Sequence, residues 1–137
     1  MKKELIINTL KEQGFDLQEL DDLGYLFQYG ESKFLYMPDD SDDDMLRFAL
    51  PSIYDINEDN RAMILELVND MNLRVKYTKV CAYMEGVWVF YEHRMSNNED
   101  VADLIEHILN LMLFTTFIFH KKVNGDFEYD NEEEEES

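Results

Sequence analysis

The sequence has few of the residues on which several classes of protein depend. Its 137 residues include one cysteine, Cys81, with five glycines and two prolines. A single cysteine forms no internal disulfide, which favours a reducing compartment. The longest apolar stretch, Leu111–Phe119, is shorter than the roughly 20 residues that a membrane span needs. Met1–Gly14 alternates charged and apolar residues, unlike a signal peptide. We therefore expect a cytoplasmic protein.

Basic residues are also scarce. The chain has 12 Lys and Arg against 31 Asp and Glu, which gives a formal net charge of −19 at pH 7. Eight of these acids lie in residues 126–137, so the rest of the chain keeps 23 acids and a charge of −11. Such a surface repels phosphate backbones and anionic lipid. We expect no nucleic-acid or membrane partner, and instead a protein client or a basic protein.

The apolar content is high enough for one folded domain. Hydrophobic residues make up 45% of the chain and aromatic residues 13%. A chain of this length forms one domain with one core. The acidic end, which has no base in residues 126–137, is typical of disorder. We predict a single α+β domain over residues 1–122 and an acidic, disordered tail over residues 123–137.

Hydrophobic residues recur with the periods of both helices and strands. Helical spacing is found before Gly14, in residues 64–71 and in residues 101–112. The segments between them alternate apolar and polar residues over short distances, which predicts antiparallel strands. The predicted order is helix, three-stranded antiparallel meander, helix, β-hairpin and helix. The predicted strands are Leu23–Tyr29, Lys33–Met37, Met45–Leu50, Arg74–Met84 and Val87–Met95, with a hairpin turn at Glu85-Gly86.

Local signals set the boundaries around the second helix. Pro51 is expected to end the third strand, because proline donates no ladder hydrogen bond. The helix is predicted to begin near Asn57, with Asp55 and Glu58 as a capping box.

The third helix has a similar signal at its start. Ser96 and Glu99 predict a capping box there. The helix is predicted to run to about His120. Phe114–Phe119 is so rich in Thr, Ile and Phe that a strand is an open alternative for that segment.

One segment partly matches a calcium-binding loop. Counted from Asp55, residues 55–66 place Asp55, Asn57, Asp59 and Glu66 at ligand positions 1, 3, 5 and 12. Asn60 occupies the position at which the pattern asks for glycine, and no helix is predicted before the loop. A helix start with acidic residues near its positive end explains the same residues. Calcium binding is therefore an alternative function, and we predict no metal or cofactor site.

Catalytic motifs are missing from the sequence. No phosphate-binding loop, glycine-rich dinucleotide turn or nucleophile elbow is present. The three histidines, His93, His107 and His120, have no partner at metal-ligand spacing. A Cys81–His93 pair is conceivable across the hairpin, but no local motif supports it, so a structural thiol is favoured. We predict that the protein is not an enzyme.

The hairpin strands carry apolar residues on both faces. Val87, Val89 and Tyr91 point to one side of the strand, and Trp88 and Phe90 point to the other. The neighbouring strand shows the same feature and adds Tyr83. An antiparallel sheet with one covered face should alternate apolar and polar residues. Either the chain's own helices cover both faces, or a second subunit or client covers one of them. Trp88, Phe90 and Tyr83 are the predicted partner-binding residues.

The order of elements resembles a known family. Leu65–Asn72, followed by Val75-Lys-Tyr77 and the Glu85-Gly86 turn, is similar to YbjN-type proteins, in which a helix ends in an Asn-rich turn before a two-stranded hairpin. Over about Lys2–Lys122, the predicted fold resembles one shared by YbjN-type proteins and class I type III secretion chaperones. This resemblance implies a cytosolic homodimer that holds a protein client without a cofactor or catalysis. The resemblance does not assign a functional role to any individual residue of this sequence.

The sequence thus predicts a non-catalytic protein-binding module that forms a homodimer. Two alternatives remain from its residues. One is a calcium-binding protein that uses residues 55–66. The other is an acidic inhibitor or immunity protein, which the net charge favours.

Overall fold

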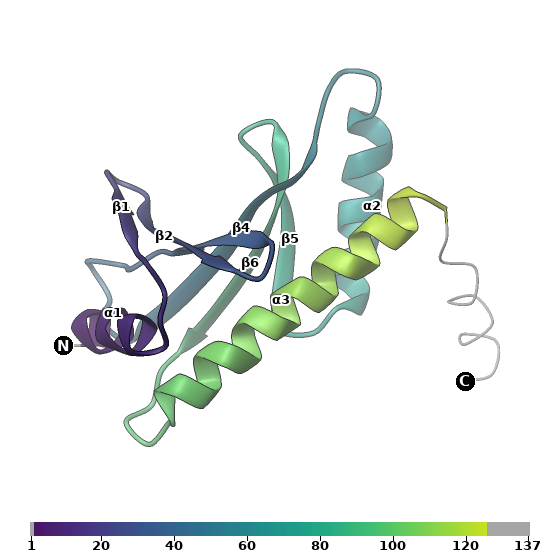
Figure 1. The fold of residues 1–137 in the computed structure, drawn as a ribbon. Helices are drawn as coiled ribbons and strands as arrows, with labels where there is room; N and C mark the ends of the chain where they lie inside the picture. Colours follow the sequence, from purple (N-terminus) through teal and green to yellow (C-terminus); the bar gives the residue numbers. More distant parts are fainter. Residues whose placement is uncertain (1, 126–137) are drawn as a thin grey trace.

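The alternating periods of the sequence produce three helices and a six-stranded antiparallel sheet in the computed structural model, which describes residues 2–125 (Figure 1). The strand order in the sheet is β1-β2-β3-β4-β6-β5. The α+β class and the meander are confirmed, because β2, β3 and β4 pair in sequence order. The elements are α1 (Lys2–Glu12), β1 (Gln18–Leu20), β2 (Gly24–Tyr29), β3 (Ser32–Tyr36), β4 (Met45–Asp55), α2 (Arg61–Arg74), β5 (Thr78–Tyr83), β6 (Gly86–Arg94) and α3 (Val101–Val123).

Two tight turns depend on left-handed backbone. Gly14 follows α1 with φ 94°, a left-handed conformation that glycine accepts readily at the end of a helix. The β5–β6 hairpin turns at Met84 and Glu85, which have φ 52° and 59°. The turn therefore lies one residue earlier than the predicted Glu85-Gly86, and Gly86 is the first residue of β6.

The strand β4 is longer than predicted. It continues past Pro51 to Asp55, and its register with β6 shifts between Leu50 and Tyr54. Ser52 has φ 50° within this irregularity. A bulge accepts proline because the residue there is left out of the ladder. The prediction that Pro51 ends the strand was therefore wrong, and β1 was missed altogether.

The helix α2 begins later than predicted, at Arg61. Asp55 is the last residue of β4, so it forms no capping box with Glu58. Instead Asn57 and Asn60 fold the intervening turn. The Asn57 N–H donates to Asn60 Oδ1 at 2.8 Å, and the Asn60 N–H donates to Asn57 Oδ1 at 2.9 Å.

The helix α3 also starts after its predicted cap. Glu99 accepts the Ser96 N–H at 2.8 Å, but the helix itself begins at Val101, where Asp100 accepts the Asp103 N–H. It then runs without interruption to Val123, so Phe114–Phe119 is helical. Val123 therefore belongs to α3 and not to the predicted tail, whose residues 126–137 lie outside the described residues.

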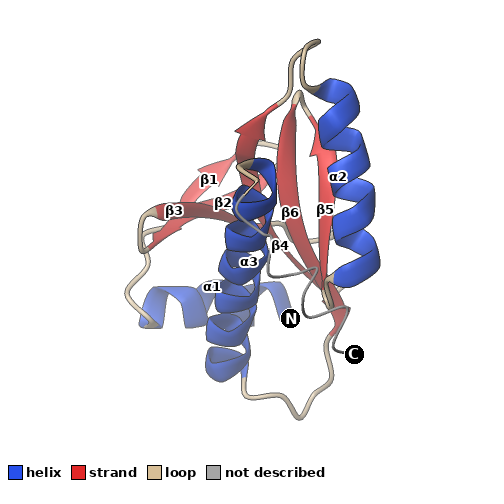
Figure 2. Cartoon of the chain, turned by 90° about the vertical axis from the view of Figure 1, so that its right-hand side faces the viewer, coloured by secondary structure: helices blue, strands red, loops and turns tan. Residues whose placement is uncertain are grey.

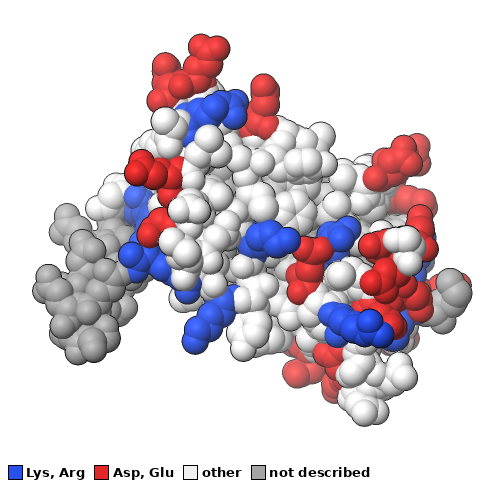
Figure 3. Space-filling view, turned by 180° about the vertical axis from the view of Figure 1, so that it is seen from behind, with Lys and Arg blue, Asp and Glu red and all other residues white. Residues whose placement is uncertain are grey.

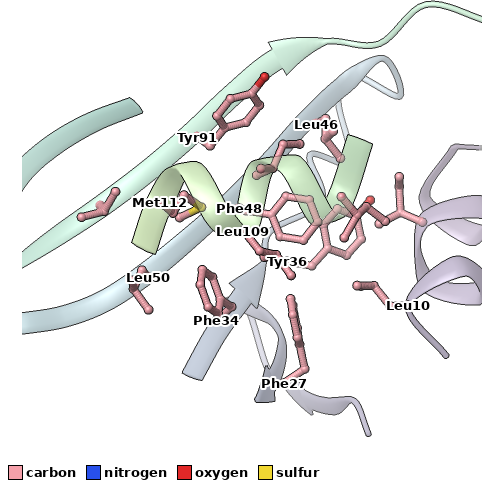
Figure 4. Close-up of a cluster of buried hydrophobic side chains, with 14 of the residues drawn as sticks. Leu10, Phe27, Phe34, Tyr36, Leu46, Phe48, Leu50, Tyr91, Leu109 and Met112 are labelled. Atoms are coloured by element: carbon pink, nitrogen blue, oxygen red, sulfur yellow. The ribbon is translucent and has the colours of Figure 1, made fainter. Parts of the chain in front are cut away.

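All three helices lie on one face of the sheet (Figure 2). The main core lies between this face and the helices α1 and α3, and Figure 4 shows its aromatic side chains, among them Phe27, Phe34 and Phe48. Phe34 and Phe48 are fully buried at its centre. The buried residues of this core are Ile6, Leu10, Phe27, Phe34, Tyr36, Leu46, Phe48, Leu50, Val89, Tyr91, Met95, Ile105, Ile108, Leu109 and Met112.

A second cluster fills the space between α2, the C-terminal half of α3 and the hairpin. Its buried residues are Ile56, Ile64, Val68, Met71, Val80, Val87 and Phe119. A polar contact joins β5 to α3 beside it, where the hydroxyls of Thr78 and Thr115 lie 2.7 Å apart and both side chains are buried. The two clusters thus bury the helix-covered face of the sheet under all three helices.

Candidate protein-binding surface

The opposite face of the sheet carries an apolar cluster to which no helix in residues 2–125 contributes a side chain. Side chains alternate along a strand, so the residues of β6 between Val87, Val89 and Tyr91 point to this side. We call this surface the helix-free face, and Figure 3 views the molecule from this side. Its cluster consists of buried Leu35, Ala49 and Trp88, with Leu20, Leu23, Leu26, Met37 and Phe90 packed around them.

The three predicted contact residues lie together on the helix-free face. The Tyr83 ring meets the Trp88 ring edge-on at 5.0 Å between centroids, and Trp88 stacks on Phe90 at 5.9 Å. Trp88 is only 6% exposed, because these two rings and the neighbouring strands cover it. Phe90 is half-buried, and Tyr83 is 46% exposed. A partner would therefore reach Tyr83 and Phe90 first. Partner binding by these residues stays a prediction.

A row of alternating charges crosses the helix-free face beside these rings. Glu92 of β6 accepts hydrogen bonds from Lys79 Nζ on β5 and from Arg47 Nε on β4, each at 2.8 Å. These bonds, that from Lys79 first, hold the pKa of Glu92 below its ordinary value. Alternation along β3 also places Lys33 on this side. Basic side chains thus outnumber acidic ones at the centre of this face, although the chain as a whole is strongly acidic.

The sheet edge next to this face is partly closed. β5 is the last strand of the sheet, and Asn72 of α2 pairs with the outer side of Val80. The Asn72 Nδ2 donates to the Val80 carbonyl at 2.7 Å, and the Val80 N–H donates to Asn72 Oδ1 at 2.8 Å. Because a side-chain amide already satisfies both groups, an added strand has no ladder bonds to make at Val80. The outer edge of β5 is therefore closed to strand addition at Val80.

The segment that partly matches a calcium-binding loop begins with a turn held by side-chain hydrogen bonds. Asn60 Nδ2 donates to the Asp55 carbonyl at 3.0 Å, and the strand β4, not a helix, precedes the loop. Glu66 lies within α2, beyond the turn. In residues 2–125, no three His, Cys, Asp or Glu side chains gather in a group that would hold a metal ion.

The conceivable Cys81–His93 pair does not form. In the register of the hairpin Cys81 lies opposite Trp88, on the helix-free face, whereas His93 is five residues further along β6 and on the other face. His93 instead contacts the Tyr91 hydroxyl at 3.1 Å and Glu99 at 3.2 Å. Burial raises the pKa of the Cys81 thiol, which disfavours the reactive thiolate.

Taken together, the fold defines an α+β domain with its helices on one face of an antiparallel sheet and an apolar, partly basic patch on the other. A family model described as "YbjN: Putative bacterial sensory transduction regulator" matches residues 2–113. The chain belongs to the YbjN family, which confirms the resemblance to YbjN-type proteins.

Structure comparison shows the same fold in a solved protein. The crystal structure of YbjN, described as a putative transcription regulator from E. coli, superposes with a TM-score of 0.67. The match covers 90% of this chain and 93% of that one at 8% sequence identity, so the likeness concerns the fold alone. No curated protein matches the sequence.

Proposed function

We propose that this chain is a non-catalytic protein-binding module that holds an extended polypeptide segment on its helix-free face. The observation that carries the proposal is the aromatic cluster of Tyr83, Trp88 and Phe90 on a sheet face without helices. Apolar surface of this kind marks interaction sites in soluble proteins. The family's description as a regulator supports a role exercised through a partner, and the free thiol of Cys81 supports a cytoplasmic setting.

The charges of the helix-free face specify the segment further. Tyr83 and Phe90 offer contact to apolar side chains, while Lys79 and Arg47 stand beside them with one carboxylate, Glu92, between them. A segment that alternates apolar residues with Asp or Glu complements both features. The overall acidity of the chain favours a basic partner at long range, and that expectation stays a prediction for other surfaces.

Two synthetic peptides test this proposal. Both are ten residues long and carry Phe and Leu at alternate positions, with Glu between them in one peptide and Lys in the other. Trp88 is the chain's only tryptophan, so its fluorescence reports directly on the site. We expect a saturable change in its emission with the Glu peptide and none with the Lys peptide.

Variants show whether this binding uses the proposed surface. Tyr83→Ser and Lys79→Glu should each weaken binding of the Glu peptide about tenfold, equivalent to about 1.4 kcal/mol. The matched control is Leu73→Ser, at an apolar side chain of α2 that is 79% exposed. If neither peptide binds, or if Tyr83→Ser and Lys79→Glu bind as tightly as the wild-type chain, the proposal is wrong.

A further inference from the structure

The residues that follow Gly125 have the pattern that the helix-free face is proposed to hold. Residues 126–137 begin with Asp-Phe-Glu-Tyr-Asp, in which acidic and aromatic side chains alternate, and later carry a run of five glutamates. They contain eight acidic residues and no basic one. We call residues 126–137 the C-terminal segment. Because its aromatic and acidic side chains match those of the proposed partner, this segment is itself a candidate ligand for the face.

The end of α3 lies at the same end of the sheet as the exposed ring of Tyr83. The centroid of the Phe119 ring, in the last turns of α3, is 5.7 Å from that of Tyr54. Tyr54 pairs with Val87, which follows Gly86, the hairpin partner of Tyr83. α3 therefore ends near the turn of the hairpin (Figure 2), and the C-terminal segment leaves the described part of the chain at this end.

The segment is long enough to reach the basic side chains of the face. An extended chain advances about 3.3 Å per residue, so the residues of the segment reach up to about 40 Å beyond Gly125. Tyr83 and Lys79 are separated by about 13 Å along β5 on the same spacing. When Phe127 and Tyr129 lie at the hairpin end, the glutamates that follow them can therefore reach the row of charges on β5 and β4.

We propose that the C-terminal segment folds back onto the helix-free face of its own chain and competes there with the extended segment of a partner. Phe127 and Tyr129 then contact Tyr83 at the hairpin end, and the glutamates lie beside Lys79 and Arg47. This inference rests on the proposed function and adds regulation to the same site. Because the segment is tethered, it competes at an effective concentration on the order of 1 mM, and a partner must displace it.

A second exposed apolar surface lies on the outer side of α3, but part of its charge opposes this segment. Phe114 is 60% exposed and Phe117 is 52% exposed there. By length and composition α3 would be able to cross a membrane, and 28% of its most apolar 18-residue window is buried. An extended segment that turned back along α3 would advance about 3.3 Å per residue, against about 1.5 Å for the helix. Its glutamates would then lie near Asp103 and Glu106 at the start of α3, where like charges repel, whereas the helix-free face offers them basic partners.

The test is the affinity of the full chain for the Glu peptide, measured through Trp88 emission. The double change Phe127→Ser and Tyr129→Ser, which we call the segment variant, removes the aromatic side chains of the C-terminal segment and keeps its charge. If the segment covers the face in about two-thirds of the molecules, the segment variant should bind the peptide about threefold more tightly than the wild-type chain. The matched control, Phe114→Ser with Phe117→Ser, removes two exposed aromatic side chains from α3 and should leave the affinity unchanged.

A free copy of the C-terminal segment tests the contact directly. A synthetic peptide of residues 126–137 should change the Trp88 emission of the segment variant in a saturable way, and the same peptide with both aromatic residues replaced by serine should not. In the segment variant, Tyr83→Ser and Lys79→Glu should weaken binding of the Glu peptide more than they do in the wild-type chain. The reason is that in the wild-type chain these changes also release the competing segment.

Two outcomes would overturn the inference while the proposed function stands. One is equal affinity of the wild-type chain and the segment variant for the Glu peptide. The other is a difference in affinity that disappears when the protein is diluted, because the segment would then be bound by another copy of the chain. If the Glu peptide binds neither chain, the proposed function itself is wrong and this inference falls with it. The two failures are therefore distinguishable.

Discussion

The two faces of the sheet are both apolar, but they bury their side chains in different ways. On the helix-covered face, Phe48 and Val89 are fully buried between the sheet and α3. On the helix-free face, Trp88 reaches nearly the same burial through the rings of Tyr83 and Phe90 and the adjacent strands. A low exposed fraction therefore does not reveal whether a second layer covers a residue. What distinguishes the faces is the layer above them: helices close the first face, whereas on the second Trp88 is bordered by Tyr83, which is 46% exposed.

The faces also differ in their polar groups. The helix-covered face places one hydroxyl pair, Thr78 and Thr115, in its interior. The helix-free face instead holds Glu92 between Lys79 and Arg47, with side-chain exposures of 25%, 59% and 28%. Charges persist where water reaches them and are excluded where it does not. The helix-free face can therefore contact water or a polar partner, whereas the helix-covered face forms the core.

The strongest test of this difference replaces one phenylalanine on each face. Phe48→Ala should lower the free energy of unfolding by about 4 kcal/mol, because it leaves a cavity beneath α3. Phe90→Ala, at the neighbouring strand on the opposite face, should lower the free energy of unfolding by only about 1 kcal/mol, since its ring is already partly exposed to water. Urea unfolding followed by far-ultraviolet circular dichroism measures both values.

The control for volume is Phe48→Leu, which fills most of the same space and should cost less than Phe48→Ala. Equal losses for Phe48→Ala and Phe90→Ala would show that the helix-free face is as much a core as the other face. The distinction between the two faces would then be lost.

Periodicity in the sequence predicted the order of the elements, because burial of one stripe or one face leaves a repeating pattern. It failed at Pro51, where a bulge lets β4 continue, and at β1, whose three residues are too few to show a period. The predicted capping boxes failed because other residues lie at the helix starts: Asn57 and Asn60 close the turn before α2, and Asp100 caps α3.

The candidate surface was only partly predictable. Alternation in β6 identified two apolar faces and grouped Trp88 with Phe90. It did not indicate which face the helices cover, because that choice depends on contacts between residues far apart in the chain. The Lys79–Glu92–Arg47 row was missed for the same reason, since it joins three strands whose neighbours are set by the sheet order. The exposed pair Phe114 and Phe117 was visible only as an ambiguous apolar segment.

A smaller effect is expected from the hydroxyl pair on the helix-covered face. Thr115→Val should lower the free energy of unfolding by about 2 kcal/mol, because it leaves the buried Thr78 hydroxyl without its partner. Thr78→Val should cost less, since Thr115 Oγ1 also donates to the Leu111 carbonyl at 3.0 Å. The double variant should be more stable than Thr115→Val alone, because no unsatisfied hydroxyl remains on β5. Thermal unfolding of the wild-type chain, the two single variants and the double variant forms a double-mutant cycle. If the losses of stability from the two single changes simply add in the double variant, the two hydroxyls are not coupled.

The smallest effect is expected from Glu92, and it should depend on pH. Its pKa in the folded chain lies below the ordinary value of 4.5, through the hydrogen bonds from Lys79 and Arg47. The stabilisation is therefore complete above pH 4.5 and is lost as the pH falls through the lower, folded-state pKa. At pH 7, Glu92→Gln should lower the free energy of unfolding by about 1 kcal/mol or less, as for other partly exposed ion pairs. The difference from the wild-type chain should disappear in acid.

The matched control for this titration is Glu31→Gln, at an exposed position in the β2–β3 turn. The free energy of unfolding of this variant should stay close to that of the wild-type chain at every pH. This result would exclude a general effect of removing one negative charge. If the loss of stability caused by Glu92→Gln stays constant down to pH 2, the packing of the Glu92 side chain, and not its charge, stabilises the fold. In that case the row of charges would be incidental to the helix-free face, and an acidic segment would have no particular reason to bind there.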